Sequence, residues 1–366
     1  MNSMKERLTD DFDFIGEKET APEPAHVYLE GGVGILGLGA YLPGKILTNA
    51  DLEKIVDTTD EWIIKRTGIS ERRIIAEGET TTSIAIAAAK AALEDAGIDG
   101  SQIGLVIVAT ATPDSFAPSA ASLVQNAVGA GICAAFDLNA GCTGSLYALL
   151  IAQSYIKCGA CEYALVVGAE TLSRAINWKD RKTCVLFGDG AGAAVLGRTP
   201  EGSGFLASML RSDGENAGMI TIPAFSISDE DLERRGGIHK STVFLEGGKV
   251  MKFASRTMSS AISSVVAAAG YNLRDIKLVT PHQANSRIIE NAARRLNLDD
   301  EQVFVNVGKY GNTSSASLLI ALMEAVAEGK LMDGELTVLV AFGAGLTYGA
   351  ALLRWRGRDG AVKLEK

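Results

Sequence analysis

The stretch "DLNAGCTGSLYALLIA", residues 137–152, places a thiol between two patterns of regular structure. The residues around its start, "AAFDLNA", alternate as in a β-strand, "GCTG" has turn composition, and "SLYALLIAQSYI" repeats apolar residues at helical spacing. Cys142 is therefore expected at the start of a helix, where free N–H groups and the positive end of the helix dipole favour a thiolate. A small, buried, unreactive cysteine fits the same letters, so this stretch alone leaves both interpretations open.

The same pattern returns about 170 residues later. "GCTGSLYALLIA" resembles "GNTSSASLLIAL", which sets Asn312 opposite Cys142. "AGIDGSQIGLVIV", from Ala96, resembles "AGYNLRDIKLVTP", from Ala269, and "ALVVGAE" resembles "VLVAFGAG". Matches in one order at nearly one offset indicate a duplication, and the alternation of helical and strand patterns predicts two β/α layer units.

A duplicated fold would bring distant polar residues together. If the halves pack about a pseudo-twofold axis, Cys142 and Asn312 come from equivalent helix starts and meet between the halves. His282 follows the strand pattern "IKLVTP", and sites in α/β proteins form beyond the carboxyl ends of strands. We therefore expect Cys142, His282 and Asn312 to converge. A loop histidine with ordinary hydrogen bonds and an asparagine that only caps a helix are the alternatives.

Composition narrows the class of protein. The chain has 366 residues, of which 47% are hydrophobic, enough for two core units, and its net charge of −9 argues against a nucleic-acid partner. Five cysteines without a framework spacing, and a lone Cys158-x-x-Cys161, indicate a reducing compartment and no zinc site. No apolar run reaches transmembrane length, and the first residues lack a signal-peptide core, so we expect a cytoplasmic protein without a membrane partner.

Composition and the repeat together divide the chain into three parts. Residues 1–30 are charged, contain prolines and are expected to form a flexible arm. Residues 31–200 are expected to form the half that carries the cysteine. Residues 201–366 are expected to form the half that carries His282 and Asn312.

Six motifs resemble those of the β-ketoacyl-acyl-carrier-protein synthase III family and occur in its order. They are "DEWIIKRTGISERR" (60–73), "NAGCTGSLYAL" (139–149), "FGDGAGAAVL" (187–196), "PHQANSRII" (281–289), "GNTSSAS" (311–317) and "FGAGLTYGAAL" (342–352). The resemblance runs from about Gly34 to Trp355 and leaves the N-terminal arm outside. It implies an α/β, thiolase-like fold with duplicated β/α halves, pseudo-twofold symmetry and αβαβα layers.

The resemblance also implies an activity. Cys142 would take the acyl group of an acyl-CoA primer, and malonyl-acyl-carrier protein would then lose CO₂ and attack the acyl-enzyme, giving the 3-oxoacyl-carrier protein that starts fatty acid synthesis. A thiolate suits this role because it is both a nucleophile and a leaving group. His282 and Asn312 would donate hydrogen bonds to the malonyl thioester oxygen, and the backbone N–H groups of Cys142 and Ala344 would hold the other oxyanion. No metal or redox cofactor is implied.

Further residues follow from the same resemblance. Trp62 and Arg181 would sandwich the CoA adenine, Arg66 would help to hold the phosphates, and Asn285 would support the site by hydrogen bonds. Trp62 could instead anchor an ordinary amphipathic helix. The family is homodimeric, and its acidic carrier protein would meet a basic rim, although charges on exposed helix faces are usually just solvated. The candidate rim residues are Lys252, Arg256, Arg287, Arg294 and Arg295.

One stretch departs from the family pattern. Short-primer members often have T-P-D-x-x-F-P, in which the phenylalanine caps the partner's acyl pocket, whereas this chain has "TPDSFAP" (112–118). Ala117 takes the capping position and Phe116 precedes it, which predicts room for primers longer than acetyl. Phe116 filling the same space through a shifted backbone is the alternative.

Other functions fit parts of the sequence less well. "GVGILG" (32–37) matches a dinucleotide-binding pattern of NAD(P)-dependent oxidoreductases, but no helix opens after it, so its glycines are expected to permit close packing in a central strand. A non-catalytic partner subunit would not need Cys142, His282 and Asn312 together, and a thiolase would need a second cysteine near "GAGLTYG". The nearest alternative is a synthase-III-like acyltransferase or primer-loading enzyme of a polyketide or other secondary pathway.

Overall fold

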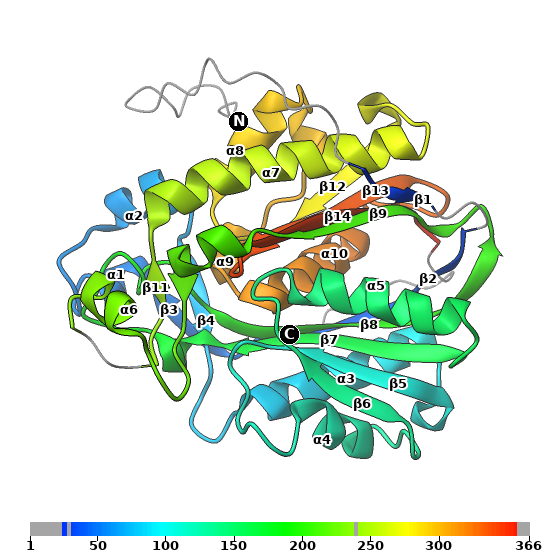
Figure 1. The fold of residues 1–366 in the computed structure, drawn as a ribbon, viewed down its shortest axis with the longest axis horizontal. Coiled ribbons are helices and arrows are strands. Elements are labelled where there is room, and N and C mark those ends of the chain that lie inside the picture. The colour runs from blue at the N-terminus through cyan, green and yellow to red at the C-terminus, as the bar shows by residue number, and fades with distance from the viewer. Residues whose placement is uncertain (1–23, 28–30, 238–240, 357–366) are drawn as a thin grey trace.

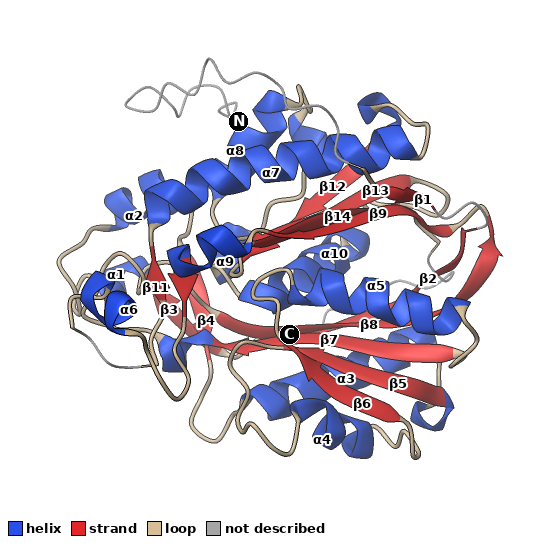
Figure 2. Cartoon of the chain, in the orientation of Figure 1, coloured by secondary structure: helices blue, strands red, loops and turns tan. Residues whose placement is uncertain are grey.

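The computed structural model describes residues 24–27, 31–237 and 241–356. Helices and sheet alternate in layers, with outer helices, half of a large sheet, a middle pair of helices, the other half of the sheet and a second outer set of helices (Figures 1 and 2). This arrangement confirms the expected αβαβα layering and the duplicated halves.

The large sheet contains ten strands, and its two halves repeat one order. The first half runs β5 (Ile103–Ala109), β7 (Tyr163–Thr171), β8 (Asp189–Glu201), β2 (Gly31–Tyr41). The second runs β12 (Ile276–Pro281), β13 (Leu336–Gly343), β14 (Thr347–Arg354), β9 (Gly204–Ser212). In each half the first two strands are parallel and the next two pairs are antiparallel. The duplication in the sequence is thus visible as a repeated topology.

The two halves meet and end differently. They are joined at the pair Val33 and Gly204, between β2 and β9. Beyond β5 the first half gains β6 (Ala134–Leu138), whereas beside β12 an isolated bridge between Val279 and Val303 takes the matching place. The strand β1 (His26–Val27) pairs with β9. Because both halves share one continuous sheet, the division at residues 200 and 201 stays a prediction.

The layer that each helix occupies matches the distribution of its apolar residues. The middle layer holds α5 (Gly144–Lys157) and α10 (Ser317–Ala327), whose residues are buried on most sides, as expected of helices between two sheet surfaces. The outer helices are α3 (Thr81–Ala96) and α4 (Ala120–Ala127) on one side, and α7 (Gly247–Ala268) and α8 (Ser286–Arg295) on the other. The starts of α5 and α10 carry the two repeat-related motifs.

Short elements gather at one end of the layers, on the left of Figure 1. They are β3 (Lys45–Thr48), α1 (Asn49–Leu52), α2 (Asp60–Thr67), β4 (Glu71–Ile74), β10 (Ile220–Thr221), α6 (Asp229–Arg234), β11 (Phe244–Leu245) and α9 (Val307–Tyr310). In the described part of the chain, 3₁₀ segments lie at Gly100–Gln102, Leu172–Ala175, Gly214–Met219, Leu273–Asp275, Asp300–Gln302 and Ser314–Ala316.

The glycines of "GVGILG" serve packing rather than a nucleotide. They lie within β2, which continues as a strand to Tyr41 instead of turning into a helix. A Cβ on Gly37 would lie 2.3 Å from the backbone nitrogen of Ala96, and one on Gly39 would lie 2.3 Å from that of Ala92. Gly37, the last glycine of the motif, and Gly39, just beyond it, therefore let α3 lie directly on the strand, as the packing interpretation expects.

The structure also bears on the expectations for the N-terminal arm, the cysteines, membrane-spanning helices and metal sites. Most of the arm expected over residues 1–30 lies outside the described residues. All five cysteines are free. Across the described ranges no helix combines the length and the apolar character that crossing a membrane requires. The same residues contain no cluster of His, Cys, Asp and Glu fit for a metal ion.

Candidate active site

Cys142 lies in the turn between β6 and α5, where the two repeats touch. Gly141 has φ of 54°, and a Cβ there would lie 2.8 Å from the nitrogen of Ala344. A Cβ on Gly343 would lie 2.5 Å from the nitrogen of Cys142. Neither Gly141 nor Gly343 can therefore be replaced by a residue with a side chain without a clash. The "GAG" loop of the second half packs directly against the turn that carries the thiol.

A threonine pair locks these two loops together. The hydroxyl of Thr347 lies 2.8 Å from the carbonyl oxygen of Ala344 and 2.9 Å from that of Ala140, and it also hydrogen-bonds the hydroxyl of Thr143. Thr143 is the N-cap of α5. The backbone N–H groups of Cys142 and Ala344, the expected oxyanion donors, are thus carried by loops that are fixed to each other.

Asn312 reaches the thiol from the start of the second repeat's helical segment. Its backbone N–H donates to the carbonyl oxygen of Leu186 at 2.8 Å, and its Oδ1 accepts from the N–H of Ser314 at 2.8 Å. Its side chain and the hydroxyl of Ser314 hydrogen-bond the sulfur of Cys142. Asn312 therefore caps the turn, as the capping alternative expects, and its side chain also lies next to the thiol.

His282 is fully buried at the end of β12. Its backbone N–H donates to Val340 at 2.7 Å, and its ring packs edge-on against Phe342, with 5.3 Å between centroids. Nδ1 lies 2.5 Å from the hydroxyl of Ser317. Nε2 has no hydrogen-bond partner among the described residues. One ring nitrogen is thus anchored and the other is free for a ligand.

The hydrogen-bond role of each ring nitrogen of His282 depends on the tautomer of the ring. The oxygen of Ser317 accepts from the backbone N–H of Gln283 at 3.3 Å, and its hydroxyl can donate to the Nδ1 of His282. In that tautomer the ring proton is on Nε2, which makes Nε2 a donor. Burial lowers the pKa of His282 to about 3, so the ring is neutral at ordinary pH.

The expectation of a thiol with a lowered pKa is wrong for this structure. Burial raises the pKa of Cys142 to about 12, and the charge of Glu170 adds to the rise, while hydrogen bonds from Ser314 and Asn312 oppose it. Desolvation therefore outweighs the contributions that favour the thiolate, and α5 itself begins at Gly144, two residues beyond the thiol. The resting group is a thiol.

The residues expected to hold CoA also come together. The guanidinium carbon of Arg66 lies 5.6 Å from the centroid of the Trp62 ring, and that of Arg181 lies 5.0 Å from it. Arg181 also donates to the backbone oxygen of Asp57 at 2.9 Å. The N-cap of α8, Asn285, donates from Nδ2 to the carbonyl oxygen of Arg66 at 3.1 Å, which ties α2 to α8.

The candidate residues for the carrier-protein rim and for the acyl pocket lie mostly on the exposed surface. The rim candidates lie on the packed pair α7 and α8, where Lys252, Arg256 and Arg294 are exposed and Arg287 and Arg295 are half-buried. Phe116 is 68% exposed and packs on Phe225, itself 81% exposed, with 4.5 Å between centroids. Ala117 is exposed as well.

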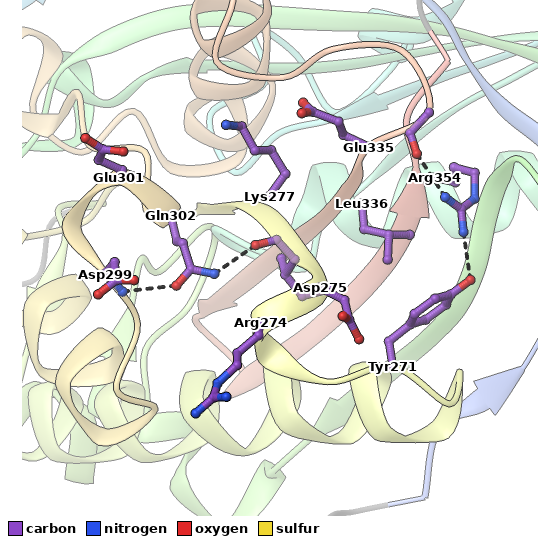
Figure 3. A pocket seen from close by; sticks show the side chains of 12 residues that line it. Tyr271, Arg274, Asp275, Lys277, Asp299, Glu301, Gln302, Glu335, Leu336 and Arg354 are labelled. Carbon is purple, nitrogen blue, oxygen red and sulfur yellow. Dashed lines mark hydrogen bonds between the residues drawn. The ribbon is translucent and has the colours of Figure 1, made fainter.

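A large open cavity lies far from the thiol. It has a volume of about 740 Å³ and is formed where β12 and β13 begin and β14 ends. Figure 3 shows that acidic and basic side chains alternate around it, with Arg354 held by Tyr271 and by the backbone. The mixed charges favour no class of ligand, so we assign it no role.

Sequence reasoning missed Ser317, Thr347 and Glu170. Ser317 and Thr347 lie within the motifs "GNTSSAS" and "FGAGLTYGAAL", but their partners depend on how strands and loops align in space. Glu170 could have been found from the sequence, because a carboxylate at the end of the apolar strand "ALVVGAE" indicates a buried charged group.

Comparison with known proteins agrees with this geometry. A family model for 3-oxoacyl-[acyl-carrier-protein (ACP)] synthase III matches residues 136–214, and its C-terminal counterpart matches residues 266–355. The beta-ketoacyl-[acyl-carrier-protein] synthase III of Caldanaerobacter subterraneus subsp. tengcongensis is 50% identical over 88% of this chain and 97% of its own.

Two solved structures bear on the fold. The synthase III of Aquifex aeolicus VF5 has a TM-score of 0.83 at 47% identity, covering 88% of this chain and 100% of its own. That of Thermus thermophilus has a TM-score of 0.84 at 46% identity, covering 88% of this chain and 99% of its own. The chain therefore belongs to the 3-oxoacyl-[acyl-carrier-protein] synthase III family of thiolase-like condensing acyltransferases, which carry out the initiating condensation of fatty acid synthesis.

Proposed function

We propose that Cys142 takes the acyl group from an acyl-CoA primer, and that His282 and Asn312 then promote the decarboxylation of malonyl-acyl-carrier protein beside it. The observation that carries this proposal is the set of contacts between the halves. Asn312 hydrogen-bonds the thiol, and His282, anchored through Ser317 and packed on Phe342, keeps a free buried Nε2.

The first step needs a nucleophile and an oxyanion site. The sulfur of Cys142 attacks the thioester carbon, CoA leaves, and the negative oxygen of the tetrahedral intermediate is met by the N–H groups of Cys142 and Ala344. The locking of Thr143 to Thr347 holds those two donors in place during the reaction. Donors fixed before the reaction stabilise developing charge without reorganisation.

The second step needs two neutral donors. Loss of CO₂ leaves an enolate whose oxygen receives hydrogen bonds from His282 Nε2 and Asn312 Nδ2. Its carbon attacks the acyl carbon of the acyl-cysteine, the carbon–sulfur bond to Cys142 breaks, and the thiolate of Cys142 leaves with the electron pair as the 3-oxoacyl-carrier protein forms. A neutral imidazole donates without a net charge, and the lowered pKa of His282 keeps it neutral. Both steps balance without an oxidant, a reductant or a metal ion, so no cofactor is part of the proposal.

Partners follow from the outer surfaces. We infer that the acidic carrier protein docks on the rim residues of α7 and α8, where Lys252 and Arg256 are one helical turn apart. We also infer a homodimer. Its support is β6, which lies at one end of the large sheet, and the pair of exposed rings formed by Phe116 and Phe225. The free cysteines support a cytoplasmic location.

Mass spectrometry of the intact protein tests the proposal directly. Incubation with acetyl-, butyryl-, hexanoyl- and octanoyl-CoA should add one acyl mass, and peptide mapping should place it on Cys142. Malonyl-acyl-carrier protein should then remove that mass and release CO₂. Cys158 is an exposed cysteine in the same chain and serves as an internal control for chemical acylation. Equal labelling of Cys142 and Cys158 would contradict the proposal.

The tryptophan of the expected CoA site gives a separate prediction. Trp62→Ala should weaken CoA binding about tenfold, because stacking on a base contributes roughly 1–3 kcal/mol. Trp62→Phe should keep most of the affinity. Calorimetric titration with CoA measures both. An acyl-N-acetylcysteamine thioester, which lacks the nucleotide, should load wild type and Trp62→Ala at one rate, and a shared loss would point to misfolding of α2 instead.

The departure at Ala117 predicts primer choice. A methyl group at the capping position leaves room that a longer acyl chain can fill, at about 0.8 kcal/mol per buried CH₂. Competition among the four acyl-CoA species should favour a chain longer than acetyl, and Ala117→Phe should shift the preference toward acetyl. A wild type selective for acetyl-CoA, unchanged by the substitution, would show that Ala117 does not set the depth of the pocket.

A further inference from the structure

Glu170 is a fully buried carboxylate that the reaction outlined above does not use. It lies near the end of β7, and its Oε2 accepts from the hydroxyl of Thr112 at 2.7 Å. Both carboxylate oxygens lie 3.2 Å from the backbone nitrogen of Ala111. Its Oε1 lies 3.0 Å from the hydroxyl oxygen of Ser314 and 2.9 Å from that of Ser315. One carboxylate thus joins the first half of the chain to a turn of the second.

The surface of β7 next to Glu170 is shaped to receive this turn. A Cβ on Gly168 would lie 2.4 Å from the carbonyl oxygen of Ser315. Because residues two apart on a strand share a face, Gly168 and Glu170 point to the same side of β7. The glycine therefore lets the backbone of the turn lie directly on the strand, and the carboxylate beside it receives the hydroxyls of the turn.

Ser314 has a backbone conformation that needs such support. Its φ is 48°, a value that residues with a Cβ seldom adopt. Its N–H donates to Oδ1 of Asn312 at 2.8 Å, and its hydroxyl donates to Oε1 of Glu170. A strained residue persists where its surroundings hold it, and these two bonds hold Ser314 by its backbone and by its side chain. Glu170 therefore acts on the residue that contacts the amide of Asn312.

The backbone of Asn312 is fixed by a different segment. Its N–H donates to the carbonyl oxygen of Leu186 at 2.8 Å, and its carbonyl oxygen accepts from the N–H of Gly188 at 3.0 Å. These bonds place the backbone but leave the side chain free to rotate. The bond from the N–H of Ser314 to Oδ1 restricts that rotation and sets the direction in which Nδ2 points.

We propose that Glu170 is a positioning residue for the decarboxylation step, because it holds Ser314 in the conformation that orients the amide of Asn312. This inference rests on the proposed role of Asn312 as a donor to the malonyl thioester oxygen. In this role Glu170 transfers no proton and does not contact the substrate. Its loss should misplace one donor, and a displacement of about 1 Å can cost about 10²-fold in rate.

Two substitutions separate the hydrogen bonds of the carboxylate from its charge. In Glu170→Gln the amide oxygen can accept from Thr112 and Ala111, and the amide nitrogen can donate to the oxygens of Ser314 and Ser315. In Glu170→Ala all of these contacts are lost. Positioning by hydrogen bonds therefore predicts a large loss of activity in the alanine variant and a much smaller loss in the glutamine variant.

The experiment measures the two steps of the reaction separately. Release of CO₂ from malonyl-acyl-carrier protein gives kcat and KM for decarboxylation, and intact mass follows single-turnover loading of Cys142 by acetyl-CoA. Glu170→Ala should lower kcat for CO₂ release about tenfold to a hundredfold, with little change in KM. Loading of Cys142 should stay close to wild type, and Glu170→Gln should recover most of the lost CO₂ release.

A double-mutant cycle shows whether Glu170 acts through Asn312. If it does, Glu170→Ala combined with Asn312→Ala should release CO₂ as fast as Asn312→Ala alone, because no amide is left to orient. Ser314→Ala keeps the N–H that contacts Asn312 but removes the hydroxyl, so it should show the same pattern with a smaller loss. If melting curves show that Glu170→Ala is unfolded, Ser314→Ala takes its place in the cycle.

Asp137→Ala is the control for the loss of a carboxylate from the first half. Asp137 lies on β6, and its two oxygens accept from the N–H groups of Ala120 and Ala121 at 2.8 Å each, at the start of α4. The variant should lower the melting temperature and leave the rate of CO₂ release unchanged.

Several outcomes overturn the proposal. Equal losses in Glu170→Gln and Glu170→Ala would show that the charge acts rather than the hydrogen bonds. Losses that add up in the double variant would show that Glu170 acts independently of Asn312, and an equal loss in Asp137→Ala would show general damage. CO₂ release at the wild-type rate in Asn312→Ala would refute the proposed function itself, whereas a loss there with none in Glu170→Ala would refute this inference alone.

Discussion

Cys142→Ser should leave a folded protein that accepts no acyl group from acyl-CoA. The substitution changes one atom in a turn, so the packing of Gly141 and Gly343 around it is kept. A hydroxyl is a far weaker acid than a thiol, and an alkoxide is a poorer leaving group, so the rate should fall at least about a thousandfold. Intact mass after incubation with acyl-CoA should show no added acyl group.

The same variant separates the two halves of the reaction. His282 and Asn312 are unchanged in it, so malonyl-acyl-carrier protein should still release CO₂, although without forming a 3-oxoacyl product. Its melting temperature should match that of wild type. Acyl loading of Cys142→Ser at a rate close to wild type would remove the thiol from the mechanism.

His282→Ala and Asn312→Ala should show the opposite pattern. Each should still load Cys142, but the release of CO₂ from malonyl-acyl-carrier protein should fall about 10²–10³-fold, the usual cost of losing one oxyanion donor. His282→Gln should recover part of the loss, since an amide N–H can reach toward the place of Nε2. Gln283 beside it is buried and hydrogen-bonded to the backbone at Pro281 and Phe304, so Gln283→Ala serves as a control for packing damage.

The pH dependence of decarboxylation adds a second check. Because burial places the pKa of His282 at about 3, below its ordinary value, the neutral donor form persists as pH falls from 8 to 5. Protonation of this ring should therefore cause no fall in rate in that range. A sharp fall near pH 6.5 that disappears in His282→Gln would show that the ring titrates normally and is solvated during the reaction.

Much of the fold was accessible from the sequence, for a definite reason. Strand and helix periodicity, repeated at nearly one offset, places Cys142 opposite Asn312, and the structure brings both to the contact between the two repeats. The glycines of "GVGILG" were assigned to packing in a central strand because no helix opens after them, and they do lie within β2. The strand and helix pattern of each segment agreed with the repeat about 170 residues away, and two independent signals that agree support one fold.

What the sequence could not supply was burial. The argument that Cys142 lies at a helix start uses only the residues next to it in the sequence. The pKa of the thiol, however, depends on residues of the second half that pack around it, namely Asn312, Ser314 and the "GAG" loop. The anchoring of His282 by Ser317 likewise depends on how α10 lies against β12. Phe116 and Ala117 are exposed in the single chain, so their predicted role depends on the homodimer that we propose.

The burial of α5 and α10 between the two halves of the sheet also bears on how the enzyme loses activity when it is heated. Both the thiol turn and the asparagine turn lead directly into these enclosed helices, so their amides exchange with solvent through opening of the whole sandwich rather than local fraying. We therefore expect the amides that follow the reacting residues to be among the slowest to exchange. We also expect heat inactivation and global unfolding to coincide.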